Sequence, residues 1–207
     1  MNRDALGRKF ARFATDVAVR YPSVWALLRP LVRLEFDRLA PTWDTRRTPG
    51  PNAYEAALER IDAASRALDL GTGTGRYAVA IARRFRGAEV VGADISEQML
   101  SEAWRQLPDD LRDRVRFVRA DASRLPFEDG EFDLVGLGNM IPFFDELDRV
   151  LVPGGWALFA FSSGPETPIY VPSERLRNEL GSRGFTDFAE ISAGSGTAFI
   201  ARKPDRA

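Results

Sequence analysis

The sequence contains neither cysteine nor histidine among its 207 residues. The absence of cysteine excludes disulfides, thiolate metal sites and cysteine nucleophiles. The absence of histidine removes the commonest metal ligand and the usual base of serine and cysteine hydrolases. We therefore expect no metal site, and proton transfer would fall to aspartate, glutamate or tyrosine.

Positive charge and long apolar runs are also scarce. The net formal charge is −1, so nothing in the composition favours nucleic acid as a partner. No run approaches the roughly 18 apolar residues of a membrane span, and the first ten residues lack the apolar stretch of a secretory signal. We expect a cytoplasmic protein. A length of 207 residues suits one domain with a small appendage.

The first 40 residues are predicted to form one or two amphipathic helices. Apolar residues recur three or four positions apart from Phe10 to Leu39, and the segment carries eight basic and four acidic residues. A basic amphipathic helix either lies on a membrane surface or covers an apolar patch of its own domain. We favour the second reading and leave membrane contact open.

From residue 54 onward, short apolar runs alternate with helical patterns. This alternation predicts an α/β fold, a doubly wound, Rossmann-like, mostly parallel sheet of seven strands with capping helices at the N-terminus. Strands are expected at 67–70, 89–93, 115–119, 132–137, 156–161, 185–191 and 197–202, and helices at 54–65, 77–85, 97–106, 144–150 and 173–183.

Glycine is concentrated where the first strand meets the following helix, in the run Gly71-Thr72-Gly73-Thr74-Gly75. Glycines there allow a tight turn and a close approach of backbone to a ligand, and the amides at a helix start favour polar or anionic groups. Arg76 stands where a dinucleotide fingerprint needs its third glycine, and the Gly-Lys-Ser/Thr of a P-loop is absent.

An acidic residue lies at the carboxyl end of each of the first three strands. Asp69 precedes the glycine turn, Asp94 follows 25 residues later, and Asp121-Ala122 ends the third strand. Parallel strands bring their carboxyl ends to one edge of the sheet, where a carboxylate can accept hydrogen bonds from ribose hydroxyls. The third strand end offers an acceptor and an amide that suit the edge of adenine.

In these segments the chain resembles the class I S-adenosylmethionine-dependent methyltransferases, in particular the small-molecule branch related to quinone-biosynthesis enzymes. The resemblance covers roughly residues 40–165. It is carried by ALDLGTGTGRYAVAIA (67–82), VVGADIS (90–96), FVRADASRLPFEDGEFDLV (117–135) and RVLVPGG (149–155). It implies a helical cap and loop over residues 1–53 and an S-adenosylmethionine-binding methyltransferase domain over residues 54–207.

The resemblance also implies a set of cofactor contacts. The glycine turn would pass beside the methionine portion, the second-strand aspartate would hold the ribose, and apolar side chains would flank adenine. Residues after the fourth strand would line the sulfonium, and an aromatic residue before the domain would close over the cofactor. The implied contacts are Trp43, Asp69, Gly71, Thr72, Gly73, Asp94, Ile95, Met99, Asp121, Ala122, Asn139 and Met140.

No catalytic residue is assigned. Transfer from a sulfonium is an in-line displacement in which positioning and water exclusion supply much of the catalysis. Candidate bases are Asp44, Asp145 and Tyr170, and Trp43, Phe143 and Phe144 are candidates for an aromatic wall.

The leading functional hypothesis is a methyltransferase that acts on a small organic acceptor. The segments 139–153 and 162–172 are short, so the acceptor and the nucleophilic atom stay open. Their brevity also leaves open a domain that binds the adenosyl cofactor without catalysis. An NAD(P)-dependent oxidoreductase is a further alternative, which Asp94 favours and Arg76 opposes. The oligomeric state is left open as well.

Overall fold

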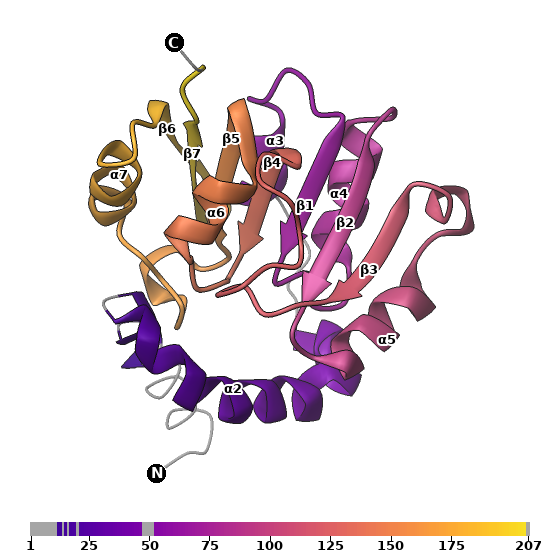
Figure 1. Cartoon of the computed structure of the whole chain (residues 1–207). Coiled ribbons are helices and arrows are strands. Elements are labelled where there is room, and N and C mark those ends of the chain that lie inside the picture. Colours follow the sequence, from indigo (N-terminus) through magenta and orange to yellow (C-terminus); the bar gives the residue numbers. More distant parts are fainter. Residues whose placement is uncertain (1–11, 14, 16, 20, 47–51, 206–207) are drawn as a thin grey trace.

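The structure is a computed structural model that describes residues 12–13, 15, 17–19, 21–46 and 52–205 (Figure 1). Its centre is a sheet of seven strands in the order β3-β2-β1-β4-β5-β7-β6. β1 to β5 are parallel, and β7 runs antiparallel to both β5 and β6. The predicted seven-stranded, mostly parallel sheet is confirmed. The strands are β1 Arg66–Leu70, β2 Glu89–Asp94, β3 Val115–Arg119, β4 Phe132–Gly138, β5 Leu151–Phe161, β6 Thr186–Ala193 and β7 Gly196–Arg202.

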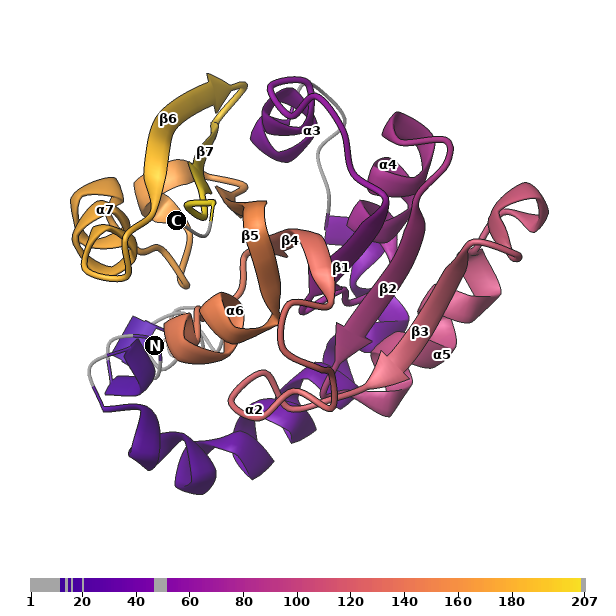
Figure 2. The same cartoon turned by 45° about the horizontal axis from the view of Figure 1, so that its top comes forward.

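Helices cover both faces of the sheet, and one lies along its carboxyl edge. α3, α4 and α5 pack on one face, and α6 and α7 pack on the other. α2 runs beneath the carboxyl ends of the central strands in both views (Figure 1, Figure 2). Among the described residues, no helix has the length and apolarity that a bilayer crossing needs. The helices are α2 Trp25–Leu39, α3 Ala53–Leu58, α4 Arg76–Arg84, α5 Glu97–Gln106, α6 Phe144–Val150 and α7 Ser173–Gly181.

Two element boundaries differ from the sequence prediction by more than two residues. The helix expected over 54–65 ends at Leu58. The chain then turns, the backbone amide of Ile61 donates to the carbonyl of Leu58, and the Ile61 side chain is completely buried. β5 begins at Leu151 rather than at residue 156. Its first residues contain Pro153 and two glycines, which disguise a strand, and a register shift opposite β4 accommodates them.

Two glycines of β4 make room for a stacked pair of tyrosines. Gly136 and Gly138 are two residues apart, so they lie on the same face of the strand. Tyr54 of α3 and Tyr77 of α4 stack there with ring centroids 3.9 Å apart and planes within 7° of parallel. A Cβ on Gly136 would lie 1.9 Å from the Tyr54 hydroxyl, and one on Gly138 would lie 2.2 Å from the Tyr77 ring. The tyrosines therefore occupy the space that side chains would take.

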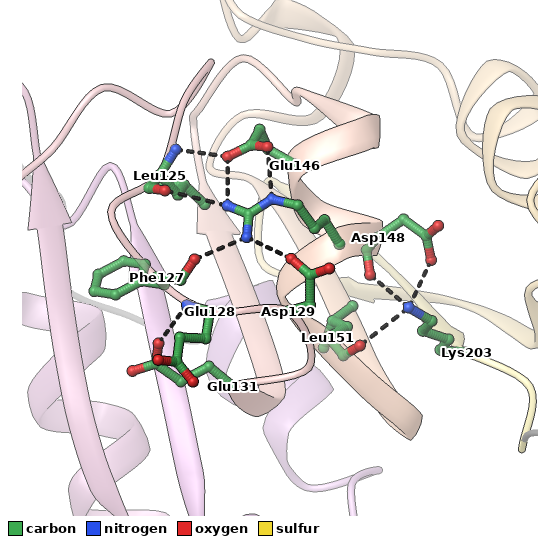
Figure 3. Close-up of polar contacts among 10 residues, drawn as sticks. Leu125, Phe127, Glu128, Asp129, Glu131, Glu146, Asp148, Leu151 and Lys203 are labelled. Carbon is green, nitrogen blue, oxygen red and sulfur yellow. Dashed lines mark hydrogen bonds and ion pairs between the residues drawn. The ribbon is translucent and has the colours of Figure 1, made fainter.

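Arg149 of α6 anchors the connection between β3 and β4 (Figure 3). Its guanidinium donates to the Glu146 carboxylate, to Asp129, and to the backbone carbonyls of Leu125 and Phe127. All five N–H groups of an arginine are thereby used. Hydrogen bonds and ion pairs to the two acids raise the pKa of Arg149, so the charge is permanent. The anchor fixes the segment that follows Asp121 at the carboxyl edge.

We predict that Gly136→Ala destabilises the fold by about 1–3 kcal/mol, because the new methyl group collides with the fully buried Tyr54. Urea unfolding measures the change. Gly87→Ala is the matched control, since no heavy atom lies within 4 Å of its Cβ position. Adding Tyr54→Phe to Gly136→Ala should recover part of the loss. Equal stability of the two alanine variants would contradict the packing described.

Candidate cofactor site

The strand order reverses direction between β1 and β4. From β1 the chain winds outward to β2 and β3, and it then returns to add β4 and β5 on the other side. In open α/β sheets, ligands bind in the crevice outside the carboxyl ends at such a switch point. The glycine turn after β1 lies there.

The glycine turn is held against the end of β2 and of β4. The backbone amides of Gly71 and Thr72 both donate to the carbonyl of Ala93, at 2.8 and 3.0 Å. Gly71 has a φ of +73°, and a Cβ on it would lie 2.7 Å from the Met140 sulfur. Glycine is required at this position both by the backbone conformation and by the close approach of Met140.

Asp69 is buried directly beneath this turn. Its Oδ2 accepts a hydrogen bond of 2.6 Å from the Thr72 hydroxyl. Its Oδ1 and the hydroxyl of Tyr54 are buried, and the Tyr54 hydroxyl and the Ala78 backbone also interact with the carboxylate. Burial raises the pKa of Asp69 to about 7, and burial together with the charge of Asp69 raises that of Tyr54. A buried carboxylate with no cation beside it suits a ligand that brings an ammonium group.

Asp94 links the end of β2 to the glycine turn. Its two oxygens accept from the backbone amides of Gly73 and Ser96, each at 2.9 Å. Burial raises the pKa of Asp94, and the nearby carboxylate of Asp37 adds to the increase. Each oxygen retains a lone pair, so the carboxylate can also accept from a pair of hydroxyls such as those of ribose.

Asp121 faces α2 across the carboxyl edge. Its Oδ1 accepts from the Trp25 indole and Oδ2 from Arg29, each at 2.8 Å, and Ser123 donates twice more to Oδ1. Burial would raise the pKa of Asp121, but the hydrogen bonds, led by that of Arg29, hold it below its usual value. Asp121 is therefore an ionised acceptor.

A cavity of about 430 Å³ opens beside Asp121, between α2 and the ends of β2 and β3. Its walls combine apolar surface with guanidinium groups, which suits a flat polar ring such as adenine. The lining residues are Arg29, Pro30, Arg33, Ile95, Arg119, Ala120 and Asp121.

Residues 67–155 match the family model of the methyltransferase domain. A demethylmenaquinone methyltransferase of Clavibacter sepedonicus is 46% identical over 114 residues, which cover 52% of this chain and 45% of that relative. A malonyl-[acyl-carrier protein] O-methyltransferase of Methylovorus sp. is 36% identical over 151 residues, covering 66% of this chain and 51% of that relative. The chain thus spans about half the length of these relatives.

Among solved structures, the Haemonchus contortus phosphoethanolamine N-methyltransferase 2 in complex with S-adenosyl-L-methionine has the same fold. It superposes with a TM-score of 0.60 at 20% identity and covers 73% of this chain and 52% of its own. Residues 67–155 are therefore similar to methyltransferase domains, and the sheet has the fold of an S-adenosylmethionine-dependent methyltransferase. The chain's sequence similarity is to the quinone-biosynthesis type.

In the methyltransferase domain, several residues that the sequence singled out lie around the glycine turn. Asp69, Thr72 and Asp94 are joined to it as described, and the Trp43 indole nitrogen lies 3.7 Å from the Cβ position of Gly73. Asn139 adopts a left-handed conformation with a φ of +52°. Its Oδ1 accepts from the Ser162 amide, so Asn139 joins the ends of β4 and β5.

Two other expected contacts lie deeper in the methyltransferase domain. Met99 and Ala122 are buried and do not line the cavity, whereas Ile95 and Asp121 do. The roles of all these residues toward the cofactor stay predictions.

Of the three candidates for an aromatic wall, Trp43 lies beside the glycine turn, whereas Phe143 and Phe144 do not line a pocket. Phe143 packs edge-on against Trp25, and Phe144 packs against Phe159, so both belong to the hydrophobic core. Trp43 packs on Phe36 of α2 instead. A short apolar run at a strand end has the same sequence pattern whether its side chains line a pocket or fill the core.

The three candidate bases lie in different surroundings. Asp44 accepts from the Thr74 hydroxyl and from Gln106, so it stands near the glycine turn. Asp145 is 88% exposed and pairs with Arg183, in the turn that follows α7. Tyr170 packs edge-on against Phe161.

Sequence reasoning missed Tyr54 under the glycine turn and Trp25 and Arg29 over the cavity. The two glycines of β4 were a signal for Tyr54, because they mark a face that accepts large side chains. Trp25 and Arg29 carry no local signal. Their contacts with Asp121 join residues more than 90 positions apart in the sequence.

We predict that Asp69→Asn removes a pH dependence of stability. Because the pKa of Asp69 is raised from 3.8 to about 7, its contribution is fully present below about pH 4 and is lost as the pH rises through about 7. The wild type should lose about 4 kcal/mol relative to the variant between about pH 4 and pH 8. Urea unfolding of both proteins across this range measures it, and parallel curves would contradict the assigned pKa.

Proposed function

We propose that this chain binds S-adenosylmethionine outside the carboxyl ends of β1, β2 and β4 and transfers its methyl group to a small organic acceptor. The observation that carries the proposal is the carboxylate of Asp69, buried beneath a glycine turn at the switch point with no cation beside it among the described residues. The amino group of a bound methionine portion would supply the missing positive charge. The cofactor also fits the hydrogen-bonding capacity left on Asp94 and the open cavity beside Asp121.

When bound, the cofactor would supply a methyl group on a positively charged sulfur. An acceptor atom would attack the methyl carbon in line with the carbon–sulfur bond, and the sulfur would leave as a neutral thioether. The residues of this chain then have three tasks. The glycine turn and Asp94 fix the position of the donor, since each lies on a strand end that the sheet holds rigid. Trp43 and Met140 flank the turn and exclude water from it. Asp44 accepts a hydrogen bond from Thr74 of the glycine turn, so it lies beside the proposed site. From there its carboxylate would accept a proton from the methyl acceptor.

For the acceptor we propose the chemistry of quinone biosynthesis, a flat aromatic ring with a nucleophilic carbon or oxygen. The demethylmenaquinone methyltransferase similarity supports it. We further propose that the protein acts in the cytoplasm, with residues 1–53 forming a cap on a domain of residues 54–207. Incubation with methyl-labelled cofactor and a short-chain demethylnaphthoquinone tests the acceptor, and labelled product would exclude the non-catalytic alternative.

We predict that Asp94→Asn weakens binding of S-adenosylhomocysteine by about 10- to 100-fold, the loss expected for hydrogen bonds to a charged group. Asparagine has one carbonyl oxygen, so it cannot accept from both backbone amides and from two hydroxyls. Isothermal titration calorimetry measures the affinity, and Asp94→Ala extends the series.

Asp110→Asn is the control for charge, because Asp110 is exposed in the short turn Asp109–Leu111 and does not line the cavity. Its affinity should equal that of the wild type. Wild-type binding by the Asp94 variants, or tight binding of NAD in place of S-adenosylhomocysteine, would refute the placement of the ribose and the assignment.

A further inference from the structure

α2 has two apolar sides, and only one of them is packed. Trp25 is buried, and Leu28 and Val32 pack against the core, so these residues form the inner side. Leu27, Leu31 and Leu34 are 77, 56 and 64% exposed. They recur four and three residues apart, which places them together on a second side of the helix. Covering the domain therefore accounts for only part of the apolar pattern.

This exposure is concentrated in one region of the molecule. Of the six large apolar side chains that are exposed in the described part of the chain, five lie between residues 13 and 34. The sixth, Trp104, lies on α5. Single exposed apolar side chains are ordinary on a protein surface, but a contiguous set on one helix marks an interaction surface.

The charge of the chain is distributed unevenly about the same region. Residues 1–40 carry four more basic than acidic residues, whereas residues 41–207 carry five more acidic than basic ones. Arg38 continues the leucine stripe by a further four residues and is 67% exposed. Within α2 itself, three arginines exceed Glu35 and Asp37 by one charge. An anionic surface would therefore attract α2 and repel the acidic remainder of the chain.

We propose that the outer side of α2, formed by Leu27, Leu31, Leu34 and Arg38, docks on the surface of a membrane that contains anionic lipids. The leucines enter the boundary between headgroups and acyl chains, and Arg38 contacts the lipid phosphates. The inner side of the same helix contributes Arg29 and Arg33 to the cavity wall. Docking therefore places the entrance of the site at the lipid surface.

A second copy of the chain is the less favoured occupant. In a two-fold contact of α2 with a second copy, two segments of the same net positive charge would meet. A lipid surface of negative charge has no such penalty.

Sedimentation with lipid vesicles tests the proposal. The full chain should bind vesicles of phosphatidylcholine and phosphatidylglycerol, and it should bind vesicles of phosphatidylcholine alone at least about fivefold more weakly. Changing Leu27, Leu31 and Leu34 together to glutamine should lower partitioning onto the anionic vesicles by more than about tenfold. Arg38→Gln should lower it by about fivefold on anionic vesicles only.

Two control variants match these changes. Trp104→Gln removes the exposed apolar side chain that lies outside the N-terminal segment. Arg112→Gln removes an arginine paired three residues away with Asp109 at 2.7 Å, the same spacing and distance as Arg38 with Glu35. Both controls should bind vesicles as the wild type does.

Three results would overturn the proposal. They are failure of the wild type to bind anionic vesicles, undiminished binding by the triple leucine variant, and a dimer that the triple variant dissociates while neither protein binds lipid. The affinity of each variant for S-adenosylhomocysteine, measured in parallel, separates failure of the docking proposal from failure of the proposed function.

Discussion

Burial of the Asp69 carboxylate beneath the glycine turn is the constraint on which the site depends. The charge has no compensating cation in the described part of the chain, and only neutral groups, led by the Thr72 hydroxyl, hydrogen-bond to it. Such a group costs stability when it is ionised, which is why its pKa rises to about 7. A fold retains a costly group of this kind where binding a ligand offsets the cost.

The surrounding structure is arranged to keep that carboxylate in place. Gly136 and Gly138 of β4 admit the two tyrosines that seal the space beneath it. Above it, the turn is tied to the end of β2 by the Ala93 carbonyl and by Asp94. The acidic groups at the carboxyl edge therefore form a connected arrangement in which each strand end restrains its neighbour.

The sequence predicted the sheet because its signals are local. Alternating apolar runs and helical patterns were sufficient to predict seven strands. An acidic residue was also correctly expected at the carboxyl end of each of the first three strands. The start of β5 was predicted wrongly because its proline and glycines are typical of a loop. In the structure, a register shift opposite β4 accommodates them within the strand.

Contacts between distant segments could not be read in this way. The hydrogen bonds from Trp25 and Arg29 to Asp121 depend on where the fold places α2. Neither the sequence of α2 nor that around Asp121 contains a pattern that predicts them. The same holds for Phe143 and Phe144, which the pattern offered as pocket lining and the fold uses as core. The amphipathic pattern of α2 was recognised, but only the structure separates its packed side from its exposed side.

The central claim is that the glycine turn, Asp69 and Asp94 together hold an adenosyl cofactor. A crystal structure of the protein with S-adenosylhomocysteine tests it most directly. The account predicts the ligand's amino group within hydrogen-bonding distance of Asp69, its ribose hydroxyls on Asp94, and its adenine in the cavity beside Asp121. A ligand bound elsewhere on the molecule, or these three carboxylates left without ligand contacts at saturating concentration, would contradict it.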